Sequence, residues 1–258
     1  MKKLFKNPLI LFALAIVLIA GSSVGAASAA FVYTTQVQQV NFSTAQISVE
    51  LLEAQSKEVD GSLVADTDNY KSVSQDTGLT YPCINQEDFK IGVKYPEVIA
   101  VRNNSNDTTG YSEYVRVIVT KSWQKDGKKD TTLSPELINL ETDDSWYHDK
   151  DADTREQSVY YLTSPLANGT SKDFIKSITI DNKVVTEGAL TTSTEEGGYT
   201  TITTTYEYDG QTFNVELEVD AVQTHNAVDA IRGAWGVTAT TDKADDGNIT
   251  SINGKSVN

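Results

Sequence analysis

The sequence predicts an all-β fold, a jelly-roll-like antiparallel β-sandwich with one or two short helices, behind an N-terminal signal peptide. Apolar and polar residues alternate with a period of two through the regular stretches, which is typical of strands with one buried face. Pairs rich in Gly, Asn, Asp and Pro separate these stretches as turns. Cys83 is the only cysteine, so no intrachain disulfide can form, and stability must come from packing and strand pairing.

The first 30 residues have the three regions of a secretory signal. Three lysines within the first six residues precede an apolar run at 9–20 and a stretch of small residues at 21–30. The apolar run is shorter than the roughly 20 residues that cross a bilayer as a helix. We therefore expect cleavage and export, leaving a protein that is soluble outside the membrane. An uncleaved N-terminal anchor is the alternative.

The net charge limits the classes of partner. The chain has 36 acidic and 21 basic residues, a formal charge of -15, and the signal contains three of the lysines and no acid, so the rest carries about -18. Such a surface repels nucleic acid and anionic lipid, because binding to phosphates depends on Lys and Arg. We expect no nucleic-acid partner and no membrane partner after processing. Export without disulfides fits the surface or extracellular matrix of a bacterium.

An extended segment at 31–43 follows the signal. Two sets of apolar residues alternate along it, so its buried face is not decided by the pattern: Phe31, Tyr33 and Val37 against Val32, Val40 and Phe42. Cleavage would leave this strand at a free chain end, and a sandwich presents unpaired edge groups that can accept a strand. We predict an assembly strand donated to a second copy. Pairing within its own subunit, or a segment without fixed structure, is the alternative.

One predicted β-sandwich domain covers residues 44–241. The clearest strands lie at 47–51, 113–123 and 213–221, where apolar residues occupy alternate positions: Ile47, Val49, Leu51; Val115, Val117, Val119, Trp123; Phe213, Val215, Leu217, Val219, Ala221. Weaker strands rich in Thr and Tyr are expected at 89–94, 98–103, 158–163, 174–180 and 201–208. Their shared alternation predicts sheets with one solvated face.

Four other stretches complete the layout. Short helices are expected after Ser134-Pro135, an N-cap with Pro at the first helical position, and at 226–235, where apolar residues share one face. The acidic stretch 56–88 has few core candidates and is interpreted as a surface excursion or an insertion within the sheet. Residues 242–258 are rich in Gly, Asn and Asp, and we expect a flexible C-terminal tail.

A weak calcium candidate lies in the acidic loop after Trp146. Asp149, Asp151 and Asp153 repeat at the spacing that opens a calcium-binding loop. The position that requires Gly holds Thr154, and the position of the bidentate Glu holds Tyr160, so the loop is not an EF-hand. A solvated acidic loop is the alternative, and no other cofactor is expected.

Catalytic patterns are sparse. His148 and His225 are the only histidines, and neither belongs to a His-Glu-x-x-His helix. A catalytic zinc usually takes three protein ligands, so distant loops would have to converge. No Gly-x-Ser-x-Gly elbow and no phosphate-binding Gly loop is present. We expect no enzymatic activity.

Several short segments, in this order along the chain, resemble the TasA, CalY and camelysin family of bacterial surface proteins. They are the junction Ala29-Ala-Phe31, Phe42-Ser-Thr-Ala-Gln-Ile-Ser-Val49, Pro96-Glu-Val-Ile-Ala-Val-Arg-Asn-Asn104, Tyr114-Val-Arg-Val-Ile-Val119 and the closing stretch from Val219 to Trp235. The resemblance leaves 56–88 and 143–160 unmatched.

The resemblance implies a function. It implies a jelly-roll-like sandwich that polymerises into extracellular fibres of a biofilm matrix after processing by a SipW-type signal peptidase. An accessory matrix protein is a further partner that the resemblance suggests. Two alternatives stay open. One is a camelysin-like surface metallo-endopeptidase, which the sparse histidines disfavour. The other is a monomeric adhesin whose binding surface uses aromatic residues: Tyr111, Trp146, Tyr147, Tyr160 and Tyr161.

Overall fold

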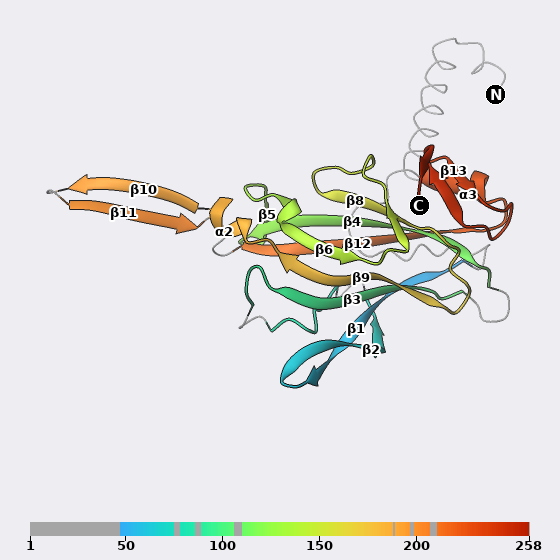
Figure 1. Cartoon of the computed structure of the whole chain (residues 1–258), viewed down its shortest axis with the longest axis horizontal. Helices are drawn as coiled ribbons and strands as arrows, with labels where there is room; N and C mark the ends of the chain where they lie inside the picture. Colours follow the sequence, from blue (N-terminus) through green and yellow to red (C-terminus); the bar gives the residue numbers. More distant parts are fainter. Residues whose placement is uncertain are drawn as a thin grey trace, which may run out of the picture. The chain divides into compact units, whose positions relative to one another are not determined.

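Two antiparallel sheets form the body of the protein. The structure is a computed structural model and describes residues 47–74, 78–85, 89–105, 110–187, 189–196, 199–206 and 211–257. Strands dominate these ranges, and all the strand pairs are antiparallel (Figure 1). The prediction of an all-β sandwich is confirmed.

The first sheet has five strands. In spatial order they are β2 (Ser62–Ser72), β1 (Val49–Val59), β3 (Lys94–Asn103), β9 (Ser171–Ile180) and β6 (Ile138–Thr142). The strands expected at 98–103 and 174–180 lie within β3 and β9. The strand expected at 89–94 is absent, because only Lys94 belongs to a strand and the residues before it form a turn and loop.

The second sheet is ordered β12 (Gln211–Gln223), β4 (Glu113–Lys125), β8 (Gln157–Leu162) and β7 (Trp146–His148), and β5 (Lys128–Asp130) also pairs with β4. The strands β12 and β4 pair along 13 residues, from Gln211 opposite Lys125 to Gln223 opposite Glu113. Asp126 and Gly127 both have positive φ, as a tight hairpin turn between β4 and β5 requires.

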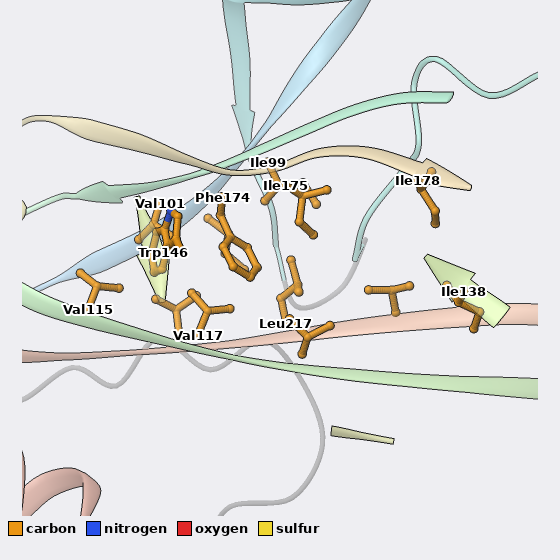
Figure 2. Packing of buried hydrophobic residues seen from close by; sticks show 14 of the residues in the cluster. Ile99, Val101, Val115, Val117, Ile138, Trp146, Phe174, Ile175, Ile178 and Leu217 are labelled. Atoms are coloured by element: carbon orange, nitrogen blue, oxygen red, sulfur yellow. The ribbon is translucent and has the colours of Figure 1, made fainter. Parts of the chain in front are cut away.

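The main core lies between the two sheets. The alternating apolar residues of β4 and β12 meet residues of β3 and β9 there, as Figure 2 shows for Val117, Leu217, Ile99 and Phe174. Val117, Ile99 and Phe174 have no exposed surface. The inward face predicted for β4 and β12 is therefore confirmed, and Glu216 and Glu218 of β12 lie on the exposed face.

A smaller core covers part of the outer face of the second sheet. The helix α3 (Ala227–Trp235) buries Ala227, Ile231 and Trp235, which recur every four residues on one face. These side chains pack in one cluster with Tyr114 of β4 and Tyr161 of β8. The helix predicted at 226–235 is confirmed, and the 3₁₀ helix η3 (Pro135–Leu137) follows Ser134 as its N-cap.

The C-terminal residues are part of this smaller core. A three-stranded sheet is formed by β13 (Ala239–Thr241), β14 (Ile249–Ile252) and β15 (Lys255–Ser256). Ile249 is 2% exposed and Ile252 is 1% exposed. The expectation of a flexible tail at 242–258 is wrong for the described residues, because two isoleucines within a polar stretch are enough to dock it.

The stretch 56–88 also contains more structure than expected. The strand β2 pairs with β1 as a hairpin. Leu79, Tyr81 and Ile84 follow it and pack against the main core. The stretch therefore joins the first sheet, as the insertion alternative expected, and the loop that follows β2 supplies core side chains.

A separate two-stranded sheet follows the short helix α2 (Lys183–Glu187). It consists of β10 (Ala189–Glu196) and β11 (Tyr199–Tyr206), which pair with each other over eight residues (Figure 1). No other described strand joins this sheet. Residues 201–206 of the strand predicted at 201–208 belong to β11, and residues 207 and 208 lie outside the described residues.

Candidate assembly site

The predicted assembly strand lies outside the described residues, which begin at Ile47. This applies to all six of its apolar residues named above: Phe31, Val32, Tyr33, Val37, Val40 and Phe42. The structure does show where this segment joins the sandwich. The junction is Ser48, the residue before β1.

Ser48 is held by a buried polar cluster. Its backbone N–H donates to Glu113 Oε1 at 2.9 Å, and its carbonyl accepts from the Asn104 N–H at 2.7 Å. The Ser105 hydroxyl donates to the same Glu113 oxygen at 2.6 Å. These bonds fix the backbone of Ser48, just before β1.

Glu113 has no exposed surface. Burial raises the pKa of its carboxyl to about 7, although the hydrogen bonds from Ser105 and Ser48 act in the opposite direction by favouring the ionised form. Its second oxygen, Oε2, is buried without a hydrogen-bond partner among the described residues. The anchor of the N-terminal segment is therefore a group that titrates near neutral pH.

Among the described strands, β12 is the long strand at one edge of the second sheet. It pairs with β4 on one side, and no described strand pairs on its other side. Val215, Leu217 and Val219 point into the core, and the residues between them lie on the outer face. A row of unpaired N–H and C=O groups on a strand with one apolar face is the surface that accepts an added strand.

The other edges are less suited to this role. β7 has three residues and β6 has five. β2 is as long as β1, but both of its faces are largely exposed, and none of its residues belongs to the buried core. An added strand would bury little apolar area on any of the three.

A pocket of about 480 Å³ lies at the start of β12. Its apolar wall is formed by Leu79, Tyr81, Ile84, Phe89 and Phe213. The ring of Phe213 packs edge-on against Tyr81 and lies 6.0 Å from the centre of Phe89. The free edge of β12 therefore begins beside a concave apolar site that is large enough for an aromatic side chain.

Two buried carboxyl groups support the wall of this pocket. Glu53 of β1 accepts hydrogen bonds from the Thr80 N–H at 2.8 Å, the Thr80 hydroxyl at 2.6 Å and the Tyr81 N–H at 3.0 Å. Glu97 of β3 is 2% exposed. Burial, followed by its hydrogen bond with Glu53 and the charge of Glu53, raises the pKa of Glu97 to about 9. Glu97 is thus protonated at neutral pH, and Glu53 ties the loop to the sheet.

These three glutamates were missed by the sequence analysis, although a signal for them exists. Glu53 falls on the same alternate positions as Val49 and Leu51, and Glu97 on those of Ile99 and Val101. Glu113 likewise falls on the positions of Val115 and Val117. An acid on the apolar face of a strand marks a buried carboxyl that needs donors.

The acidic loop does not gather its three aspartates. Asp151 forms an ion pair with Lys255, and Asp153 Oδ1 lies 2.9 Å from His148 Nε2. Asp149 is buried, and its Oδ2 has no hydrogen-bond partner in the described part of the chain. Across the described ranges, no group of three or more His, Cys, Asp or Glu side chains is arranged to hold a metal ion.

The aromatic residues named for an adhesin are mostly internal. Trp146 is 5% exposed and donates its ring N–H to the Asp173 carbonyl at 2.7 Å, and Tyr161 is 1% exposed. Tyr160 stacks on His148, with ring centres 4.4 Å apart. Tyr111 alone of the five is largely exposed, at 63%. The five residues therefore do not form a common binding surface.

Comparison with known proteins adds no family. No family model, curated protein or solved structure matches the chain. Within the described residues, no helix combines the length and the apolar character needed to cross a bilayer.

Proposed function

We propose that this chain is a secreted structural subunit of an extracellular bacterial fibre, such as that of a biofilm matrix. The N-terminal strand of one copy, residues 31–43, pairs with the free edge of β12 in the next copy. Each copy both donates and accepts, so the contact is head to tail and propagates. The signal tethers the strand until a dedicated SipW-type peptidase removes it, and an accessory matrix protein is a possible second partner.

The free edge of β12 is the observation that carries this proposal. Its 13 residues match the twelve residues from Phe31 to Phe42 in length. A strand paired along it would extend the second sheet by a row of backbone hydrogen bonds. The pocket beside Phe213 offers a place for one aromatic side chain of the donor.

Negative-stain electron microscopy tests the assembly. The chain that begins at Phe31 is compared with a chain that lacks residues 31–43. Filaments from the longer chain alone support strand donation. Filaments from both chains would show that a different contact drives polymerisation.

Cross-linking between copies tests the acceptor edge. One chain carries Gln38→Cys or Gln39→Cys in the donor, and a second chain carries Cys at an outer-face position of β12, in turn Asn214, Glu216 and Glu218. Disulfide-linked dimers from the mixed chains are expected for the positions in register. Asp68→Cys on the β2 edge is the matched control and should give none; cross-linking there instead would move the acceptor to β2.

The native cysteine does not interfere with this experiment. Cys83 is 5% exposed. Burial raises the pKa of its thiol to about 11, so little of the reactive thiolate is present at neutral pH. The background of disulfides through Cys83 is therefore expected to be low.

A further inference from the structure

The hairpin of β10 and β11 has two open edges. Its register runs from Ala189 opposite Tyr206 to Glu196 opposite Tyr199, and no other described strand pairs with it. An isolated two-stranded hairpin is marginally stable in water. The hairpin would gain backbone hydrogen bonds if a further strand joined it.

The strand β11 carries no charged residue. Its sequence is Tyr-Thr-Thr-Ile-Thr-Thr-Thr-Tyr, and every residue is β-branched or aromatic. Each other described strand of eight or more residues contains at least two charged residues. Charged residues on an edge normally prevent it from pairing with another chain. The chain has a net charge of -15, yet among the described strands β11 is a long edge strand that carries no charged residue to prevent such pairing.

The sequence of β11 is also nearly the same in both directions. If two copies of β11 lie antiparallel, with the two-fold axis between Ile202 and Thr203, three of the four kinds of pair are between identical residues, and the central pair joins Ile202 to Thr203, both β-branched. Tyr199 is then opposite Tyr206, Thr200 opposite Thr205, and Thr201 opposite Thr204. Aromatic pairs and Thr–Thr pairs are favourable directly across two strands.

We propose that the free edge of β11 is a self-association surface, where β11 of one copy pairs antiparallel with β11 of a second copy. The product is a four-stranded sheet in the order β10, β11, β11, β10. The contact uses the same surface on both copies, so it closes as a two-fold pair and does not propagate. In a fibre it would join subunits side by side. The proposal stands on the hairpin and does not depend on donation of the N-terminal strand.

The edge of β12 does not fit this kind of contact. Glu216, Glu218 and Asp220 alternate along it. Two antiparallel copies of β12 would set these acids close to one another, and like charges across two strands are destabilising. A β12 edge therefore takes a different strand, whereas a β11 edge takes its own copy.

Paired charge substitutions in the chain that begins at Phe31 test the inference. Thr201→Lys with Thr204→Lys places like charges opposite each other at two points, and Thr201→Glu with Thr204→Glu does the same. Thr201→Lys with Thr204→Glu places opposite charges there and is the matched control. Ser62→Lys, on the exposed edge of β2, controls for added positive charge.

Self-association is measured by sedimentation where the protein is not filamentous, and by the number of filaments per bundle where it is. Each like-charge variant should associate at least ~10-fold more weakly than the unsubstituted chain. The Lys/Glu variant and Ser62→Lys should keep the association, and mixing the Lys/Lys and Glu/Glu variants should restore it. Restoration on mixing also shows that the hairpin of each variant still forms.

Two results would overturn the inference. One is an unsubstituted chain that shows no pairing or bundling, and the other is equal association of all the variants. If the like-charge variants form filaments that bundle as those of the unsubstituted chain do, the β11 contact is rejected and strand donation is unaffected. If no filaments form, but the unsubstituted chain dimerises and the like-charge variants do not, the β11 contact is supported and strand donation is rejected.

Discussion

Glu97 on β3 hydrogen-bonds with Glu53 on β1, and the second partner of Glu53 is the backbone of the loop at Thr80 and Tyr81. The raised pKa of Glu97 keeps its carboxyl protonated at neutral pH, beside the carboxyl that accepts hydrogen bonds from the loop. Two adjacent ionised carboxylates in this buried position would repel each other. The strand-to-loop contact beside the pocket thus depends on the protonation of Glu97.

Stability should fall as the pH rises because of Glu97. Its pKa is raised from 4.5 to about 9 in the folded protein, so the folded state holds the proton more tightly than the unfolded state. The proton on Glu97 therefore contributes fully to the free energy of unfolding below pH 4.5. This contribution falls by up to about 1.4 kcal/mol per pH unit as the pH rises toward 9. Denaturant unfolding of Glu97→Gln should show a flatter profile between pH 7 and 9. Exposed Glu58→Gln is the control, and an unaltered slope in Glu97→Gln would contradict this assignment.

Removal of the Ser48 anchor should destabilise the protein. Glu113→Ala leaves the Ser105 hydroxyl and the Ser48 N–H without their buried acceptor, at a cost of about 2–3 kcal/mol. Glu113→Gln should destabilise the protein less than Glu113→Ala does. It should also remove the change of the free energy of unfolding between pH 4.5 and pH 7, because the raised pKa of about 7 belongs to Glu113. Chemical unfolding at pH 5 and pH 8 measures both effects. Equal stability of Glu113→Ala and Glu58→Ala would count against the anchor.

A charge between the sheets should be poorly tolerated. Val117 has no exposed surface and packs with β12 and β9. Val117→Asp is expected to lower the free energy of unfolding by roughly 3–5 kcal/mol, because the carboxylate would be buried without a partner. Asn139→Asp, at an exposed position of β6, is the isosteric control. A melting temperature that stays constant in Val117→Asp would mean that the core lies elsewhere.

The C-terminal strand should be needed for stability. Ile252→Ala removes a side chain that is 1% exposed and is expected to cost about 2–5 kcal/mol. Lys243→Ala, at an exposed position between β13 and β14, should lower the free energy of unfolding by less than about 0.5 kcal/mol, as is usual for surface substitutions. Thermal unfolding compares the two variants. Equal melting temperatures would restore the interpretation of 242–258 as a tail.

Calcium titration tests the acidic loop. Asp151 is paired with Lys255, Asp153 with His148, and Asp149 is buried, so the three carboxylates are not gathered around a common cation site. We expect no saturable heat in isothermal titration at millimolar calcium. A binding isotherm that disappears in Asp151→Ala would revive the sequence-based calcium site.

The sequence predicted the strands whose two faces differ most. In β4 and β12, apolar and polar residues alternate, since one face meets the other sheet and the opposite face meets solvent. In β2 both faces are largely exposed, so no alternation exists to detect. Ile249 and Ile252 of β14 are both buried although they are three residues apart. The register shift between Thr240 and Thr241 accompanies this break in the period of two.

The candidate site was predicted only in outline. A free strand and an accepting edge followed from the signal junction and the sandwich class. The identity of the edge did not, because strand order is set by contacts between residues far apart in sequence, such as Gln211 with Lys125. The buried positions of Glu53, Glu97 and Glu113 likewise depend on donors from other strands and loops.

The fixed position of Ser48 has a consequence for the dimensions of a fibre. Phe42 is the last apolar residue of the donated strand, and the six steps from there to Ser48 span at most about 22 Å when fully extended. A bound donor strand would therefore hold consecutive subunits within a narrow range of separations. The axial rise per subunit would be set by this short tether, and bending of the filament would be confined to the same few residues.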